Sequence, residues 1–136
     1  MEGFILSDDL SKLPLLDLAR KYLNLMKKVR KNIKIIEKAE RLSTNGKRRY
    51  KFDFLIEDPS SGDLIGVQVK DWKRTLGVNA VIQFWKKINE TGLTMGILIG
   101  TEFSETARRR AVENIFLISR GELISYLRTV DLKTSE

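Results

Sequence analysis

Residues 50–72, YKFDFLIEDPSSGDLIGVQVKDW, constrain the fold more than any other part of the chain. Apolar and polar residues alternate on both sides of a Pro-Ser-Ser-Gly sequence, which is the pattern of two β-strands joined by a turn. If Glu57 pairs with Leu64, Asp53 stands opposite Gln68 in an antiparallel hairpin. The sequence therefore predicts a hairpin whose register brings these two polar side chains together.

Side chains alternate between the two faces of a strand, so the same register predicts an apolar face and a polar face. We expect the apolar face to meet the core, and it carries Phe52, Phe54, Ile56, Ile65, Val67 and Val69. The other face carries Asp53, Gln68 and Lys70, and directly opposed residues have Cβ atoms about 5 Å apart. One interpretation is the solvent face of an amphipathic hairpin. The other is a functional site on a sheet that helices cover.

The rest of the chain favours a covered sheet. Helical spacing of apolar residues predicts a helix at about 13–31, with Leu13, Leu16, Leu23, Met26 and Val29 on its apolar face, and another at 78–92, with Val81, Phe84, Trp85 and Ile88 on one face. A strand at 33–42 leads through Asn45-Gly46, a strong turn pair, into the hairpin. Short apolar runs at 94–100 and 115–119 predict buried strands. Helices are expected at 104–114, with Ser104 as N-cap, and at 121–130.

These elements predict an α/β fold in the order αβββαβαβα, with a mixed sheet flanked by helices. We expect one domain over residues 1–136, with the core at about 33–127. The chain has no long apolar run, and its first ten residues lack the features of a signal peptide, so we expect a cytoplasmic protein that does not enter the membrane.

The composition narrows the chemistry. The chain contains no cysteine and no histidine, which excludes thiolate and imidazole metal sites, Ser-His-Asp triads and nucleases with a histidine base. Any metal must be held by oxygen ligands, which favours magnesium, manganese or calcium. The formal net charge of +7 is typical of a small domain that binds a polyanion, although solvated lysines alone would give the same number.

A chemical role for the polar face follows from these exclusions. A carboxylate, a neighbouring amide carbonyl and a backbone carbonyl can together hold a hard divalent cation, which fills its remaining positions with water and substrate phosphate. Lys70 would lie on the same side and could orient an attacking water whose pKa the metal lowers.

These residues resemble the PD-(D/E)xK nuclease superfamily, and specifically Mrr-like restriction endonuclease catalytic domains, which are related more distantly to archaeal Holliday-junction resolvases. The motif is an aspartate on one strand followed one hairpin later by a Gln-x-Lys triplet, here Asp53 and Gln68-Val69-Lys70. The downstream stretch GILIGTEFSETARRRAVENIFLISRGELISYL is similar to the end of an Mrr-type domain. The resemblance covers roughly residues 15–127.

The resemblance implies a restriction-endonuclease-like core with Mg²⁺ or Mn²⁺ as cofactor. It implies that Asp53 is a metal ligand, that Gln68 takes a position held by an acid elsewhere in the superfamily, and that Lys70 is the catalytic lysine. The backbone carbonyl of Val69 would complete the protein ligands. The family often has a glutamate on the first helix, where this sequence offers only Asp17.

Several other residues have two interpretations. Asp17 is either an additional metal ligand or a solvated helix residue, and Glu37 and Glu40 are weaker substitutes for it. Gln83 matches a polar position of resolvase-like relatives but could simply be exposed. Trp72 and Trp85 could stack on bases, or could pack where the sheet meets a helix. The run 108–110 contains three arginines that cannot all face one surface of a helix.

Two basic groups near the hairpin are the predicted DNA contacts, namely Lys47, Arg48, Arg49 and Lys51 before the aspartate, and Lys73 and Arg74 after the lysine. The leading hypothesis is a metal-dependent DNA endonuclease, expected to act as a homodimer because one active site cuts one strand. The alternatives are a non-catalytic nucleic-acid-binding protein with the same fold, favoured by Gln68 and the missing helix glutamate, and an assembly subunit with an acidic partner.

Overall fold

The structure is a computed structural model that describes the backbone of residues 10–134 and the side chains of residues 10–130. The prediction that the first ten residues are not a signal peptide concerns a segment of which residues 1–9 lie outside the described residues. The elements are α2 (Leu15–Val29), β1 (Lys34–Leu42), β2 (Arg49–Asp58), β3 (Asp63–Lys70), α3 (Val78–Glu90), β4 (Met95–Gly100), α4 (Glu105–Arg110), β5 (Ile115–Ser119) and α5 (Arg120–Thr134). The predicted order αβββαβαβα is confirmed.

The strands form one five-stranded sheet in the order β1-β2-β3-β4-β5. The first three strands are antiparallel, and β3, β4 and β5 are parallel to one another, so the sheet is mixed as expected. Glu57 pairs with Leu64, which confirms the predicted register of the β2–β3 hairpin. The Asn45-Gly46 pair forms the β1–β2 turn, where Gly46 has a φ of 74°.

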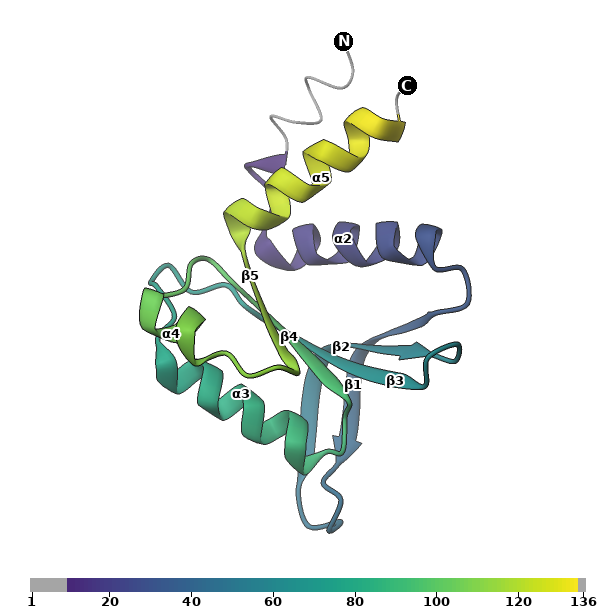
Figure 1. Cartoon of the computed structure of the whole chain (residues 1–136), viewed down its shortest axis with the longest axis vertical. Helices are drawn as coiled ribbons and strands as arrows, with labels where there is room; N and C mark the ends of the chain where they lie inside the picture. The colour runs from purple at the N-terminus through teal and green to yellow at the C-terminus, as the bar shows by residue number, and fades with distance from the viewer. Residues whose placement is uncertain (1–9, 135–136) are drawn as a thin grey trace.

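Helices cover the sheet on both faces (Figure 1). One hydrophobic cluster joins α2 and α5 to the sheet through residues such as Leu18, Leu123, Phe54 and Ile97. A second joins α3 and α4 to the other face through residues such as Phe84, Ala107 and Leu98. The hairpin therefore has no wholly solvent-exposed face. None of the helices in the described range 10–134 is long and apolar enough to cross a membrane.

The buried face of α2 differs from the predicted one. The helix begins after Pro14 and buries Leu15, Leu18, Ala19 and Leu23, whereas Leu16 is 36% exposed and Val29 80% exposed. The buried residues follow i, i+3, i+4 and i+8, which is the face that a helix turns toward a sheet. The strand β5 is also less buried than expected, because it lies at the sheet edge and leaves Phe116 49% exposed.

The apolar face of the hairpin is interrupted at Phe52. Phe54 and Ile56 pack in the cluster under α2, as predicted, but Phe52 packs in the cluster under α3. Its partner on β1, Ala39, lies in the same α3 cluster, and the preceding residue Lys38 has a φ of 51°. Positive φ is uncommon for a residue with a side chain, and the β1–β2 hairpin turns away from β3 in this region (Figure 1). Simple alternation therefore fails at this bend.

Two glycines bring α3 unusually close to the sheet. Gly66 and Gly96 are paired across β3 and β4. A Cβ atom on Gly66 would meet Leu93 at 2.7 Å, and one on Gly96 would meet Ile88 and Phe84 at 2.7 Å. Residues with side chains cannot be accommodated at such distances without movement. The close approach sets how deeply the side chains of α3 reach over the hairpin.

Candidate active site

The polar residues of the hairpin lie where its two strands separate. The β2–β3 ladder runs from Asp58–Asp63 to Phe54–Val67 and ends there, although β2 extends back to Arg49 and β3 extends on to Lys70. Beyond the last pair, backbone groups of β3 that face β2 must find other partners. The fork between the strands is therefore a place where a polar side chain is needed.

Asp53 fills this fork. Its Oδ2 accepts a hydrogen bond from the backbone N–H of Val69 at 2.6 Å and another from Nε2 of Gln68 at 3.0 Å. The structure thus brings Asp53 and Gln68 together, as the register predicts. Both side chains are half-buried. The carboxylate replaces a strand partner for Val69 and is held in a fixed orientation by two donors.

Lys87 is a component of this site that the sequence reasoning did not select. Its Nζ donates to Oε1 of Gln68 at 2.6 Å and to the backbone carbonyl of Lys51, and it lies 4.4 Å from the centre of the Phe52 ring. Burial lowers the pKa of Lys87 and the positive charge of Lys70 lowers it further, while Asp53 acts in the opposite direction. A continuous chain of hydrogen bonds therefore runs from the Asp53 carboxylate through the Gln68 amide to the Lys87 ammonium.

A sequence signal for Lys87 did exist. It follows Phe84 by three residues, which places it about 60° from that buried residue on the helical wheel of α3, so it borders the buried face. It also lies four residues after Gln83, which places both polar side chains on adjoining turns of one face. Because it stands in the adjacent pair Lys86-Lys87, the same signal is equally consistent with a solvated basic surface.

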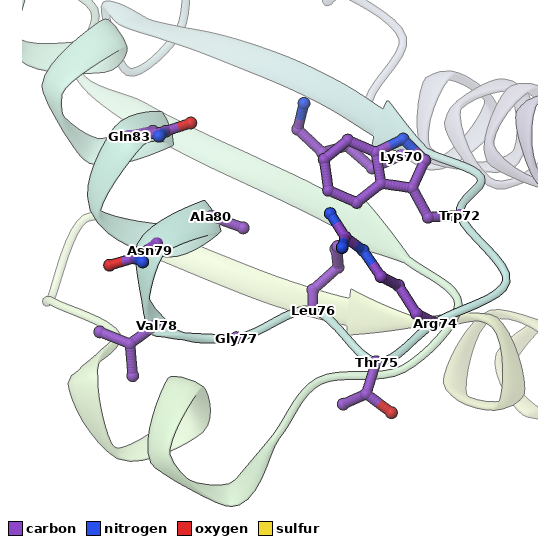
Figure 2. Close-up of a pocket in the computed structure, with 10 residues that line it drawn as sticks. All are labelled: Lys70, Trp72, Arg74, Thr75, Leu76, Gly77, Val78, Asn79, Ala80 and Gln83. Atoms are coloured by element: carbon purple, nitrogen blue, oxygen red, sulfur yellow. The ribbon is translucent and has the colours of Figure 1, made fainter.

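Lys70 opens onto a cavity of about 450 Å³ beside the start of α3. The cavity is also lined by Trp72, Arg74 and Gln83, and Figure 2 shows the Gln83 amide directed from α3 toward the Lys70 amine. The Lys70 Nζ and the Arg74 guanidinium each lie 4.8 Å from the Trp72 ring centre. This wall offers two cations and an amide to a ligand, which suits an anionic group.

The additional acids form ion pairs with arginines. Asp17 pairs with Arg20 at 2.7 Å, and Arg20 also pairs with Glu37 at 2.9 Å. Glu40 pairs with Arg49 at 3.1 Å. Over the residues whose side chains are described, no three His, Cys, Asp or Glu side chains are grouped closely enough to hold a metal ion.

The two predicted DNA-contact groups lie at opposite ends of α3. Lys73 and Arg74 are exposed in the loop before the helix begins. The β1–β2 turn contacts the other end, where the backbone N–H of Thr44 donates to the carbonyl of Glu90 at 2.8 Å. Lys47, Arg48, Arg49 and Lys51 are exposed at this end. The candidate site lies beside the helix that separates the two groups.

Both tryptophans are partly exposed. Trp72 is 41% exposed and Trp85 is 37% exposed, although Trp85 was expected on the buried face of α3. In the arginine run, Arg108 pairs with Glu122 at 2.7 Å and Arg109 with Glu105 at 2.5 Å. Ser104 caps α4 as predicted by accepting from the backbone N–H of Ala107 at 3.1 Å.

The donor set of the fork suits a hard divalent ion in part. Asp53, the Gln68 amide and a backbone carbonyl are oxygen ligands, and magnesium in proteins often uses one or two carboxylates and takes its other ligands from water and phosphate. A metal ion that used Oε1 of Gln68 as a ligand would compete with the Lys87 ammonium, which already contacts this oxygen.

The chain is similar to two solved structures, of which the first supports this architecture. Among solved structures, the chain is similar to a protein of unknown function, AF1548, with a TM-score of 0.64 and 12% identity over 83% of this chain and 66% of that chain. It is also similar to a repair endonuclease from Pyrococcus abyssi, with a TM-score of 0.43 and 17% identity over 74% of this chain and 46% of that chain. The chain thus spans less than two thirds of either protein. No curated protein matches it significantly.

The family comparison covers most of the chain. The Mrr_cat family, described as restriction endonuclease, matches residues 27–127. These residues include the whole sheet, α3 and the fork with Asp53, Gln68 and Lys70. The chain belongs to the Mrr_cat restriction endonuclease family.

Proposed function

We propose that this domain hydrolyses phosphodiester bonds of DNA at the β2–β3 fork with Mg²⁺ or Mn²⁺. The observation that carries the proposal is the fixed carboxylate of Asp53 beside Gln68 and Val69, with Lys70 further along the same strand. Family membership supports the reaction class, and the oxygen donors support the kind of metal.

Each residue has a distinct role in this proposal. Asp53, the amide oxygen of Gln68 and the backbone carbonyl of Val69 would hold the ion, which would supply Lewis-acid activation of the phosphate and of the attacking water. Lys70 orients the attacking water and offsets the charge that develops on the phosphate oxygens. The two N–H donors on Oδ2 of Asp53 keep the carboxylate oriented, so little reorganisation is needed when substrate arrives.

The proposed DNA path follows α3. The helix has 13 residues, so it is about 20 Å long and spans about six base pairs of duplex. Lys73 and Arg74 would hold phosphates at its beginning, and Lys47, Arg48, Arg49 and Lys51 at its end. One site cuts one strand, so cleavage of both strands by this domain would need a homodimer or two binding events.

The decisive experiment compares two aspartates of the same hairpin. Asp53→Asn should reduce nicking of supercoiled plasmid in Mg²⁺ or Mn²⁺ by at least about 100-fold, because losing a metal-holding or charge-stabilising group typically costs that much. Asp63→Asn changes the same charge at the paired end of the hairpin and should leave nicking at the wild-type level. EDTA should abolish nicking by every variant.

DNA binding provides the second measurement. In Ca²⁺, which replaces the catalytic ion, Asp53→Asn should bind DNA as well as or better than wild type, because it removes a negative charge that faces phosphate. Wild-type nicking by Asp53→Asn would contradict the site assignment. Equal loss of nicking in Asp63→Asn would show that the hairpin as a whole had been damaged.

A non-catalytic nucleic-acid-binding function is the second candidate. It is favoured by the Lys87 ammonium on the Gln68 oxygen and by the engagement of Asp17 with Arg20. In that case the wild-type protein would bind DNA with the same salt dependence but would not nick supercoiled, linear, single-stranded or branched DNA in either metal.

A further inference from the structure

The ammonium of Lys87 is held in the fork by the kinds of group that bind a cation. Its ammonium contacts the amide oxygen of Gln68, the backbone carbonyl of Lys51 and the face of the Phe52 ring. All three groups present negative potential, and all belong to the two strands that form the fork. The close approach of α3 over Gly66 and Gly96 brings the lysine to this depth.

The contacts of Gln68 fix the direction of its amide. Nε2 donates to Asp53 at 3.0 Å, and Oε1 accepts from Lys87 at 2.6 Å. The reverse orientation would place an amide N–H₂ against an ammonium and an amide oxygen against a carboxylate. The oxygen that the proposed function assigns to the metal is therefore directed at Lys87.

The fork already carries more positive than negative charge. The ammonium of Lys87 is close enough to feel both the single carboxylate of Asp53 and the second ammonium, that of Lys70. A divalent ion added to the same oxygens would lie within a few ångströms of an ammonium, where like charges repel strongly even in a partly solvated site.

We propose that Lys87 is the resident cation of the free protein and that it restricts metal binding until a DNA phosphate supplies negative charge. This inference rests on the proposed function of the fork. In the DNA-free protein, Lys87 holds the Gln68 oxygen and makes metal binding weak. When phosphate enters, the ammonium leaves Gln68 for the phosphate and the oxygen becomes available. The domain thereby couples metal loading to the presence of its substrate.

The test measures Mn²⁺ binding to the DNA-free protein by calorimetry, with three lysine variants. Lys87→Met removes the charge but keeps an apolar stem of similar length over Phe52, and it should bind Mn²⁺ at least about tenfold more tightly than wild type. Lys86→Met removes the same charge from the neighbouring exposed position and should bind within about twofold of wild type. Lys87→Arg keeps the charge and should stay close to wild type. Circular dichroism checks the fold of each, and Lys87→Gln replaces Lys87→Met if that protein does not fold.

The site of the ion is tested in the same experiment. Adding Asp53→Asn to Lys87→Met should remove the tight binding. The inference is overturned if Lys87→Met binds no more tightly than Lys86→Met, if tight binding survives Asp53→Asn, or if no variant binds Mn²⁺. Wild-type plasmid nicking that is lost in Asp53→Asn would then show that the proposed function stands without this inference, whereas absence of nicking would remove both.

Discussion

The two ends of the β2–β3 hairpin are built differently. At the closed end, residues 54–58 pair with residues 63–67 in a continuous ladder, and apolar side chains such as Phe54 and Ile56 are buried under α2. At the open end, residues 49–53 of β2 and residues 68–70 of β3 are not paired with each other, and side chains from β2, β3 and α3 connect the two strands instead. The same hairpin thus contributes its paired half to the core and its separated half to the candidate site.

The difference shows how a strand fork prepares a site. The N–H of Val69 would be satisfied by a strand partner in a longer ladder, but here it is satisfied by the Asp53 carboxylate at 2.6 Å. A backbone requirement therefore fixes the orientation of a chemically useful group. The closed end is expected to determine stability, and the open end is expected to determine metal and DNA binding.

The largest effect on stability is expected at the closed end. Phe54 is 1% exposed, so Phe54→Ala should lower the free energy of unfolding by about 3–5 kcal/mol through lost burial and the cavity left behind. Gln68→Ala at the open end, a half-buried position, should cost only about 1 kcal/mol for its hydrogen bonds. Urea denaturation measures both, and equal losses would contradict the division between the two ends.

A smaller effect on stability is expected from a substitution that moves α3 away from the sheet. A Cβ on Gly96 would lie 2.7 Å from Ile88 and Phe84, so Gly96→Ala should cost about 1–3 kcal/mol by overpacking. The same displacement should weaken the contact of Lys87 with Gln68 and raise Mn²⁺ affinity in the DNA-free protein. Gly77→Ala is a suitable control, because a Cβ there meets nothing within 4 Å. A destabilised Gly96→Ala with unchanged Mn²⁺ affinity would mean that helix position does not control Lys87.

The smallest effect on stability should come from the exposed basic residues of the open end. Replacing Lys47, Arg48 and Arg49 by Ala should change the free energy of unfolding by about 0.5 kcal/mol or less at each position. It should nevertheless weaken the salt dependence of DNA binding. The slope of log K against log salt concentration, about −4 to −5 for the parent protein, should become shallower by up to about 3, because each lost phosphate contact removes about one unit.

Fluorescence anisotropy in Ca²⁺ measures this slope without cleavage. The matched control replaces Lys27, Lys28 and Lys31 by Ala, an equal loss of charge around the end of α2. The next residue after this helix, Arg30, contacts Asp58 at the closed end of the hairpin. The control should keep the parent slope. A slope that flattens equally in both variants would indicate a general effect of charge rather than a DNA path along α3.

The sequence by itself determined the parts of this protein that depend on local pattern. Alternation and the Pro-Ser-Ser-Gly turn predicted the register in which Glu57 meets Leu64, and hence the meeting of Asp53 with Gln68. The order of apolar runs predicted the mixed sheet with helices on both faces. These features follow from the strand and helix periods, which neighbouring residues are enough to reveal.

Only the tertiary structure decided where the hairpin opens and what enters the opening. The positive φ of Lys38 and the transfer of Phe52 to the α3 cluster break the alternation. Lys87 reaches Gln68 because Gly66 and Gly96 let a helix from later in the chain lie close to the sheet. A bend and a close helix approach depend on packing between distant segments, and no period within either segment encodes them.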